Sequence, residues 1–329
     1  MKSNKWKFLL TGAATLTLLT ACTQASSQSA TKSNTAQTTA TSTSKNKTNN
    51  SNYFTDKDKD TSYDESKAST VKLSGSSASV SGDGVAVSGS TVTISKAGTY
   101  VISGESDGVQ IKVEAGDSDD VHIVLKGVTM TNTNAPISAT KAGHVYLTLA
   151  DGTTNTLSDS SSNNDEDADA VIFSKGDLTI NGSGTLNIDA KKNNGIKAND
   201  TLHITGGTYK ITAVGDAFNV NDELNITATT MTIDADEDAV KVDNDEDTSV
   251  GTMYLSDNKM TITAGDDGIH ASGDLIIESG TYKETESVEG LEGESITSNG
   301  GDITTYATED GVDAANANAN QDDIFFAMN

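Results

Sequence analysis

The chain has 329 residues, with 48 acidic and 22 basic side chains and a formal net charge of −26. So acidic a protein is a poor partner for nucleic acid or anionic lipid, because phosphate binding requires a basic surface. Aromatic residues make up only 5% of the chain, and the single tryptophan, Trp6, lies in the N-terminal segment, which excludes a flat tryptophan platform for crystalline polysaccharide.

Residues 1–21 have the features of a signal peptide. Three lysines within residues 2–7 precede an apolar stretch, residues 8–19, that is too short to span a membrane. The sequence Leu-Thr-Ala-Cys at 19–22 resembles a bacterial lipobox, and Cys22 is the only cysteine. We therefore expect Cys22 to be lipidated, and the protein to be held at the extracellular face of the cell membrane by this lipid anchor alone.

Residues 22–66 consist mostly of Ser, Thr, Ala, Asn, Gln and Lys. Such a composition cannot bury a core and predicts a disordered tether. The rest, residues 67–329, fits one continuous domain better than two globular ones. Its first part, from Val71, has short β-like runs separated by Gly, Ser and Asp, and we expect these to form less regular first turns and a cap.

One short motif recurs from Asp169 to Ala314: an acidic or amide residue, a small residue, and then an apolar residue. The motif opens at Asp169, Asn194, Asp216, Asp238, Asp267, Glu289 and Asp310, with spacings of 25, 22, 22, 29, 22 and 21 residues. An acidic insertion of seven residues within 243–250 accounts for the spacing of 29. A repeat this short, without helical periodicity, predicts a solenoid.

Each repeat contains three short runs of alternating apolar residues, which predict three strands. The fold class is therefore all-β, a right-handed, three-sided parallel β-helix with rungs of about 22 residues. The large residues Tyr209, Met231, Met260 and Tyr282 recur at one position. They form either an exposed sugar-stacking platform or an interior column, and the alternation favours the interior. Glu284 breaks this pattern, and we expect the register to loosen there.

The opening residues of successive rungs should stack as a column of carboxylates at one corner of the solenoid. Carboxylates one strand spacing apart repel each other, so either their pKa values rise or a cation joins them. Calcium, which prefers oxygen ligands, fits such a corner. The candidate calcium ligands are Asp216, Asp236, Glu237, Asp238, Asp266, Asp267, Glu289, Glu292, Glu309, Asp310 and Asp313. The alternative is that these are solvated turn residues of an acidic protein.

Several segments resemble a bacterial family of carbohydrate-binding, calcium-containing parallel β-helix proteins that bind cellulose and pectin. The segments are residues 97–104, 168–186, 268–280, 287–293 and 308–313. This family is similar in fold to pectate lyases, which use an Asp-Asp-Gly-x-Asp calcium motif. Here residues 266–270 end in His270 instead of Asp, and residues 309–313 begin with Glu instead of Asp.

The resemblance implies a protein that binds polysaccharide through calcium and is not an enzyme. The sequence gives no sign of an oligomer, so we expect a monomer. The first alternative is a calcium-dependent polysaccharide lyase, which needs a base to remove a proton. Lys197 or Lys241 could be this base, but an exposed lysine stays protonated near neutral pH. The second alternative is a structural surface or adhesion stalk, in which calcium only makes the solenoid rigid.

Overall fold

The computed structural model describes residues 36–42, 52–244, 246–314 and 325–328. Every helix or strand element in these ranges is a strand. The strands are β1(Ala36–Ser42), β2(Ser69–Gly75), β3(Ser77–Ser81), β4(Val85–Ser88), β5(Thr91–Ile94), β6(Gly98–Asp107), β7(Gln110–Glu114), β8(Asp120–Thr131), β9(Ile137–Lys141), β10(His144–Leu149), β11(Thr154–Ser158), β12(Ala170–Ser174), β13(Leu178–Gly182), β14(Thr185–Ala190), β15(Asn194–Ala198), β16(Thr201–Thr205), β17(Thr208–Ala213), β18(Phe218–Val220), β19(Glu223–Thr227), β20(Thr230–Ala235), β21(Val240–Val242), β22(Thr252–Ser256), β23(Asn258–Ala264), β24(Ile269–Ile277), β25(Gly280–Glu286), β26(Leu291–Ser298), β27(Gly301–Ala307), β28(Val312–Ala314) and β29(Phe325–Met328). None of the described residues forms a helix long and apolar enough to cross a membrane.

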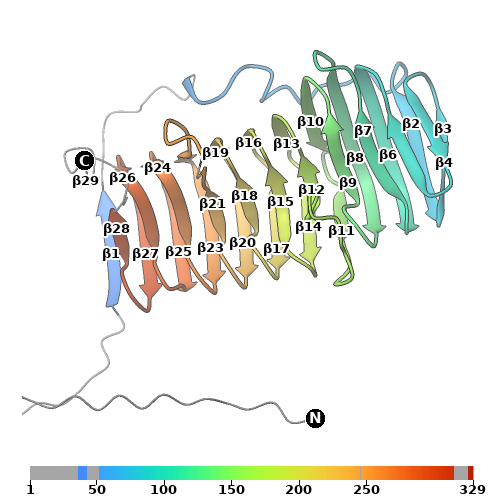
Figure 1. Cartoon of the computed structure of the whole chain (residues 1–329). Helices are drawn as coiled ribbons and strands as arrows, with labels where there is room; N and C mark the ends of the chain where they lie inside the picture. Colours follow the sequence, from blue (N-terminus) through green and yellow to red (C-terminus); the bar gives the residue numbers. More distant parts are fainter. Residues whose placement is uncertain (1–35, 43–51, 245, 315–324, 329) are drawn as a thin grey trace, which may run out of the picture. The chain divides into compact units, whose positions relative to one another are not determined.

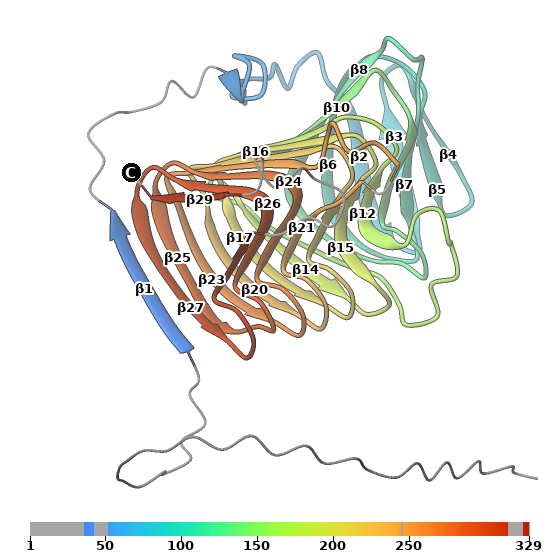
Figure 2. The ribbon, with the colours of Figure 1, turned by 60° about the vertical axis from the view of Figure 1, so that its left-hand side comes forward.

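The strands stack in parallel from one turn of the chain to the next. Each strand from β12 to β21 pairs with the strand three places later, such as β14 with β17 and β17 with β20. The paired residues are 22 apart in the middle of this run, as Tyr209 and Met231 are, 23 or 24 apart before it, and 29 apart where the pairing spans the acidic insertion. Figures 1 and 2 show these turns stacked along the solenoid. The all-β class and the stacked parallel repeat are confirmed, whereas the right-handed, three-sided winding stays a prediction.

Large apolar side chains fill the interior of the stack. Tyr209, Met231, Met260 and Tyr282 pair in register and are each 1% exposed, so the interior column is confirmed. The register loosens at Glu284, as expected, although Glu284 itself still pairs with Ile262 and is fully buried. It shifts just after this pair, where Thr263 lies opposite Glu286.

Hairpins and an added strand lie at the two ends of the stack. The antiparallel pairs β2–β3 and β4–β5 belong to the first turns, which are less regular, as expected from the sequence. At the other end, β1 pairs antiparallel with β27 over its whole length. Added strands satisfy backbone groups that a terminal turn would otherwise leave unpaired.

The tether prediction is wrong for residues 52–66, which pack along the outer face of the solenoid. Phe54 is 4% exposed and Asp58 is 2% exposed. The ring of Tyr53 stacks on Tyr254 with centroids 3.7 Å apart. Asp58 Oδ2 lies 3.2 Å from Nδ1 of His203. The aromatic rings and one paired carboxylate thus supply contacts that the polar composition conceals. The signal peptide, Cys22 and the other predicted tether residues, apart from β1, lie outside the described residues.

Candidate functional site

The opening residues of successive rungs form a hydrogen-bonded column at one corner. The backbone N–H of Asp216 donates to Oδ1 of Asn194 at 3.0 Å, and that of Asp238 donates to Oδ1 of Asp216 at 2.9 Å. The same bond joins Asp267 to Asp238 at 2.9 Å and Glu289 to Asp267 at 3.3 Å. One oxygen of each buried carboxylate therefore holds the next rung in place, which explains why short acidic or amide side chains recur here.

From Asn194 onward, the residue three positions after each opening residue decides the charge of the corner. These residues occupy one register column: Lys197, Asn219, Lys241, His270, Glu292 and Asp313. We call the rungs opened by Asp169 to Asp238 the early rungs and those opened by Glu289 and Asp310 the late rungs. The column thus changes from basic and amide side chains in the early rungs to acidic side chains in the late rungs.

In the early rungs the protein supplies its own partner for the second carboxylate oxygen. Lys197 Nζ lies 2.7 Å from Oδ1 of Asp169, and Lys241 Nζ lies 2.7 Å from Oδ2 of Asp238. Burial alone would lower the pKa of Lys241, but its bond with Asp238 raises the pKa above the ordinary value. Lys241 is therefore protonated over the physiological range.

His270 links the two halves of the corner. Its Nδ1 lies 2.6 Å from Oε2 of Glu292 and 3.3 Å from Oδ2 of Asp267. Burial alone would lower the pKa of His270, but these two carboxylates outweigh burial and raise it to about 10. His270 is thus a half-buried cation between two carboxylates.

The late rungs gather carboxylates around positions that have no lysine. Carboxylate oxygens of Asp267, Glu289 and Glu292 lie within 4.8 Å of one another. Burial, followed by repulsion from Glu292 and Asp267, raises the pKa of Glu289 to about 7. Asp313 pairs in register with Glu292 and adds a further carboxylate to the column. This donor set of hard oxygens fits the ligand preference of calcium.

The structure separates the predicted calcium ligands into three groups. Asp216, Asp238 and Asp267 are buried members of the column. Asp236, Glu237, Asp266, Glu309 and Asp310 are exposed at the flanking turns. Glu289, Glu292 and Asp313 are half-buried in the late rungs. Ligand atoms lie within 4.8 Å of one another only for Asp238, Asp267 and His270 and for Asp267, Glu289 and Glu292 among the described residues, and the role of all the predicted ligands stays a prediction.

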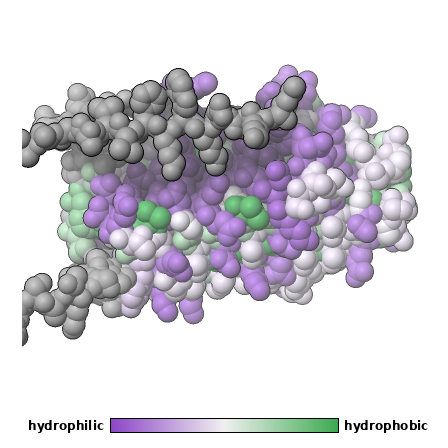
Figure 3. All heavy atoms as spheres, turned by 60° about the horizontal axis from the view of Figure 1, so that its bottom comes forward, coloured by the Kyte–Doolittle hydropathy of each residue, from purple (hydrophilic) through white to green (hydrophobic). Residues whose placement is uncertain are grey.

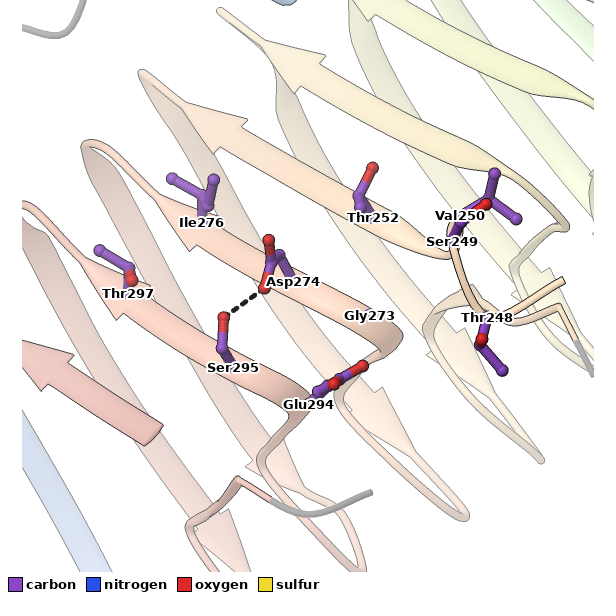
Figure 4. A pocket seen from close by; sticks show the side chains of 10 residues that line it. All are labelled: Thr248, Ser249, Val250, Thr252, Gly273, Asp274, Ile276, Glu294, Ser295 and Thr297. Carbon is purple, nitrogen blue, oxygen red and sulfur yellow. Dashed lines mark hydrogen bonds between the residues drawn. The ribbon is translucent and has the colours of Figure 1, made fainter. Parts of the chain in front are cut away.

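A shallow groove of about 420 Å³ lies on the outer face formed by β22, β24 and β26. Figure 4 shows side chains from neighbouring strands that point into it, and the Ser295 hydroxyl donates to Oδ1 of Asp274. The lining is mostly Ser, Thr and acidic residues, with Val250 and Ile276 as its larger apolar members. Such a surface can form hydrogen bonds with a ligand rich in hydroxyl groups.

Apolar side chains do not form a broad patch on the face seen in Figure 3, where strongly apolar residues are separate spots among hydrophilic ones. Among the described residues, the large hydrophobic side chains that are exposed are Val87, Val214, Phe326 and Met328. Single exposed apolar residues are ordinary on a protein surface. The face in view therefore favours a polar ligand over an apolar one.

The model of the family of carbohydrate-binding domain-containing proteins matches residues 88–324, and the chain belongs to this family. A relative from Acetivibrio thermocellus, described as a carbohydrate-binding domain-containing protein, is 36% identical over 126 residues. This alignment covers 36% of the present chain and 44% of the relative, which is less than half of the relative's length.

A solved structure with a similar fold is that of a polysaccharide lyase-like protein from C. thermocellum, determined as a gadolinium derivative. It has a TM-score of 0.63 and 28% sequence identity, and the match covers 79% of the present chain and 99% of the other chain. The likeness to this structure supports a β-helix-like fold for the chain.

Proposed function

We propose that this protein is a lipid-anchored, extracellular protein that binds acidic polysaccharide through calcium and does not cleave it. Membership of the carbohydrate-binding family supports a polysaccharide partner. The finer proposal includes lipidation at Cys22, a monomeric state, and a right-handed, three-sided winding that keeps the acidic corner continuous from rung to rung.

The observation that carries the calcium proposal is the charge balance of the late corner. Asp267, Glu289 and Glu292 place their oxygens within 4.8 Å of one another, and His270 is the protein cation among them. Glu289 and Asp313 add charge that His270 cannot balance alone. Carboxylates this close favour binding of a cation, since otherwise their mutual repulsion makes ionisation costly. When bound, calcium would supply coordination positions for the carboxylate of an acidic sugar.

An acidic protein would otherwise repel an acidic polysaccharide. With a net charge of −26, the chain has an unfavourable electrostatic interaction with polygalacturonate. A calcium ion held between the Glu289 and Glu292 carboxylates would cancel most of the local negative charge, so an acidic sugar would be repelled less there. The groove of Ser, Thr and acidic side chains on β22, β24 and β26 offers further hydrogen bonds to the hydroxyl groups of the same chain.

Lyase activity is the alternative that the lyase-like neighbour favours. A lyase needs an unprotonated base near the metal. Both lysines considered for this role bind a carboxylate instead: Lys197 binds Asp169 and Lys241 binds Asp238, each at 2.7 Å. An ammonium group held this way is a poor proton acceptor, which supports a binding function over catalysis.

The test is a pull-down of the protein with insoluble polygalacturonate and with a neutral glucan, each in calcium and in chelator. We expect the acidic polymer to retain the protein only in calcium, and Glu289→Gln/Glu292→Gln to abolish retention. The control Asp234→Asn/Glu286→Gln removes two exposed carboxylates and should be retained like wild type. Retention on the neutral glucan that survives chelator would contradict the proposed calcium bridge. An ultraviolet-absorbing unsaturated product would establish the lyase instead.

A further inference from the structure

A carboxylate interrupts an interior column of isoleucines. The column consists of Ile188, Ile211, Ile233 and Ile262, which pair in register through four successive rungs, and Glu284 takes the next place. Glu284 is 0% exposed, and neither carboxylate oxygen has a hydrogen-bond partner. The surface corner does not explain this residue, because Glu284 points into the solenoid.

Two further polar residues lie at adjacent interior positions. Tyr282 and Ile303 are paired, so Thr305 follows Glu284 one rung later in the same column. Ser287 bridges to Ala307 on the next rung. Ser287 and Thr305 are 2% and 1% exposed, and their hydroxyl oxygens also lack partners. Among the described residues, four of the seven buried polar side-chain atoms without a partner belong to these three residues.

Glycines provide the space above these oxygens. A Cβ atom on Gly268 would lie 2.6 Å from Oε1 of Glu284 and 2.8 Å from the carbonyl oxygen of Gly290. A Cβ atom on Gly290 would lie 2.8 Å from Cβ of Thr305. The corresponding corner residues of the two preceding rungs, where the column holds isoleucine, are Ala217 and Ala239. Gly195 holds the same corner position beside Ile211, so the glycines let the column side chains approach closely, and the side chains themselves make this part of the interior polar.

We propose that Glu284, Ser287 and Thr305 bind a monovalent metal cation, of the sodium or potassium class, inside the last rungs. An ionised carboxylate without a partner costs several kcal/mol in a protein interior, so it needs a counter-charge. One carboxylate balances the charge of a monovalent ion, whereas a divalent ion would leave an uncompensated positive charge in the interior. Ligand oxygens about 2.4 Å from one ion lie roughly 3.4 Å or more from one another, which is too far for good hydrogen bonds between them. A shared ion is therefore compatible with oxygens that have no hydrogen-bond partner.

The experiment compares thermal unfolding in sodium chloride, potassium chloride and N-methylglucamine chloride at equal ionic strength, at pH 8 with chelator. We expect the Tm of wild type to be several degrees higher in sodium or potassium than in the organic salt. Glu284→Gln should lose this shift. The control Glu286→Gln, an exposed residue on the same strand, should keep it. If Glu284→Gln does not fold, Thr305→Val keeps the carboxylate and should reduce the shift.

Two results would overturn the interior cation site. The first is an equal Tm of wild type in all three salts. The second is a sodium-dependent shift that persists in Glu284→Gln. If Glu284→Gln were more stable than wild type by the same amount in every salt, Glu284 would carry a proton instead of binding a cation, which also contradicts the site. All variants keep the surface corner, so failure of this inference leaves the proposed polysaccharide binding untouched.

Discussion

The early and late rungs differ in the partner that the opening carboxylate meets at the corner. In the early rungs Asp216 meets Asn219 and Asp238 meets Lys241, each three positions later, and Asp169 meets Lys197 of the next rung. In the late rungs Glu289 meets Glu292, and Asp310 is followed by Asp313. The backbone hydrogen bond from rung to rung continues through Asp267 to Glu289. The column is therefore structural as far as Glu289, and its late end keeps the excess negative charge that a cation could balance.

Removal of a cation from the early corner should have the largest effect on stability. In Lys241→Met the carboxylate of Asp238, 2% exposed, loses its partner. We expect a loss of about 2–3 kcal/mol in the free energy of unfolding, below the range for fully buried pairs because Lys241 is partly exposed. Urea unfolding measures this loss, and Lys210→Met, at an exposed lysine, should cost less than about 0.5 kcal/mol. Equal losses in the two variants would show that the early pairs are not structural.

Addition of a cation to the late corner should make it resemble the early one. Asp313→Lys places an ammonium group beside Glu292, its partner in register. We expect a gain of about 0.5–1 kcal/mol in the metal-free protein, and a weaker stabilisation by calcium. Asp302→Lys, at an exposed position on β27, makes the same change in net charge and is the control. A calcium effect that is unchanged in Asp313→Lys would place the ion elsewhere.

The late corner should also give the metal-free protein a distinct pH dependence. The pKa of Glu289 is raised to about 7, so the folded protein binds this proton more tightly than the unfolded chain does. The stabilisation is present at low pH and is lost as the pH rises from about 4.5 through 7. We expect the Tm in chelator to fall over this window and to fall less in Glu289→Gln. Glu284, whose pKa is also raised, is common to both proteins, so the difference isolates Glu289.

The sequence predicted the stacked column well because the register of a solenoid follows from repeat length. Once the seven-residue insertion was removed, Tyr209, Met231, Met260 and Tyr282 aligned as they do in the structure. The roles within the corner were harder to predict. The spacing of Asp238 and Lys241 is visible in the sequence. Whether their side chains point toward each other depends on the backbone path of the turn, which the spacing does not reveal.

The packed segment at residues 52–66 was missed for a different reason. Its composition is polar, and composition averages over the few residues that make the contacts. Tyr53, Phe54 and Asp58 are the residues that stack on, or are buried against, the solenoid. The aromatic residues Tyr53 and Phe54, within a stretch of Ser, Thr and Lys, were the sequence feature that could have predicted this packing. Nothing in the sequence indicated that the partner of Asp58 is His203, because 145 residues separate them.

Calcium titration by calorimetry tests the central claim most directly. It compares wild type, the late-corner variant Glu289→Gln/Glu292→Gln/Asp313→Asn, and Asp236→Asn/Glu237→Gln, which removes two exposed carboxylates beside the early corner. The account predicts that the late-corner variant loses calcium binding at the corner, whereas the early-corner variant binds like wild type. Wild-type binding in the late-corner variant, or loss of binding in the early-corner variant, would contradict the claim.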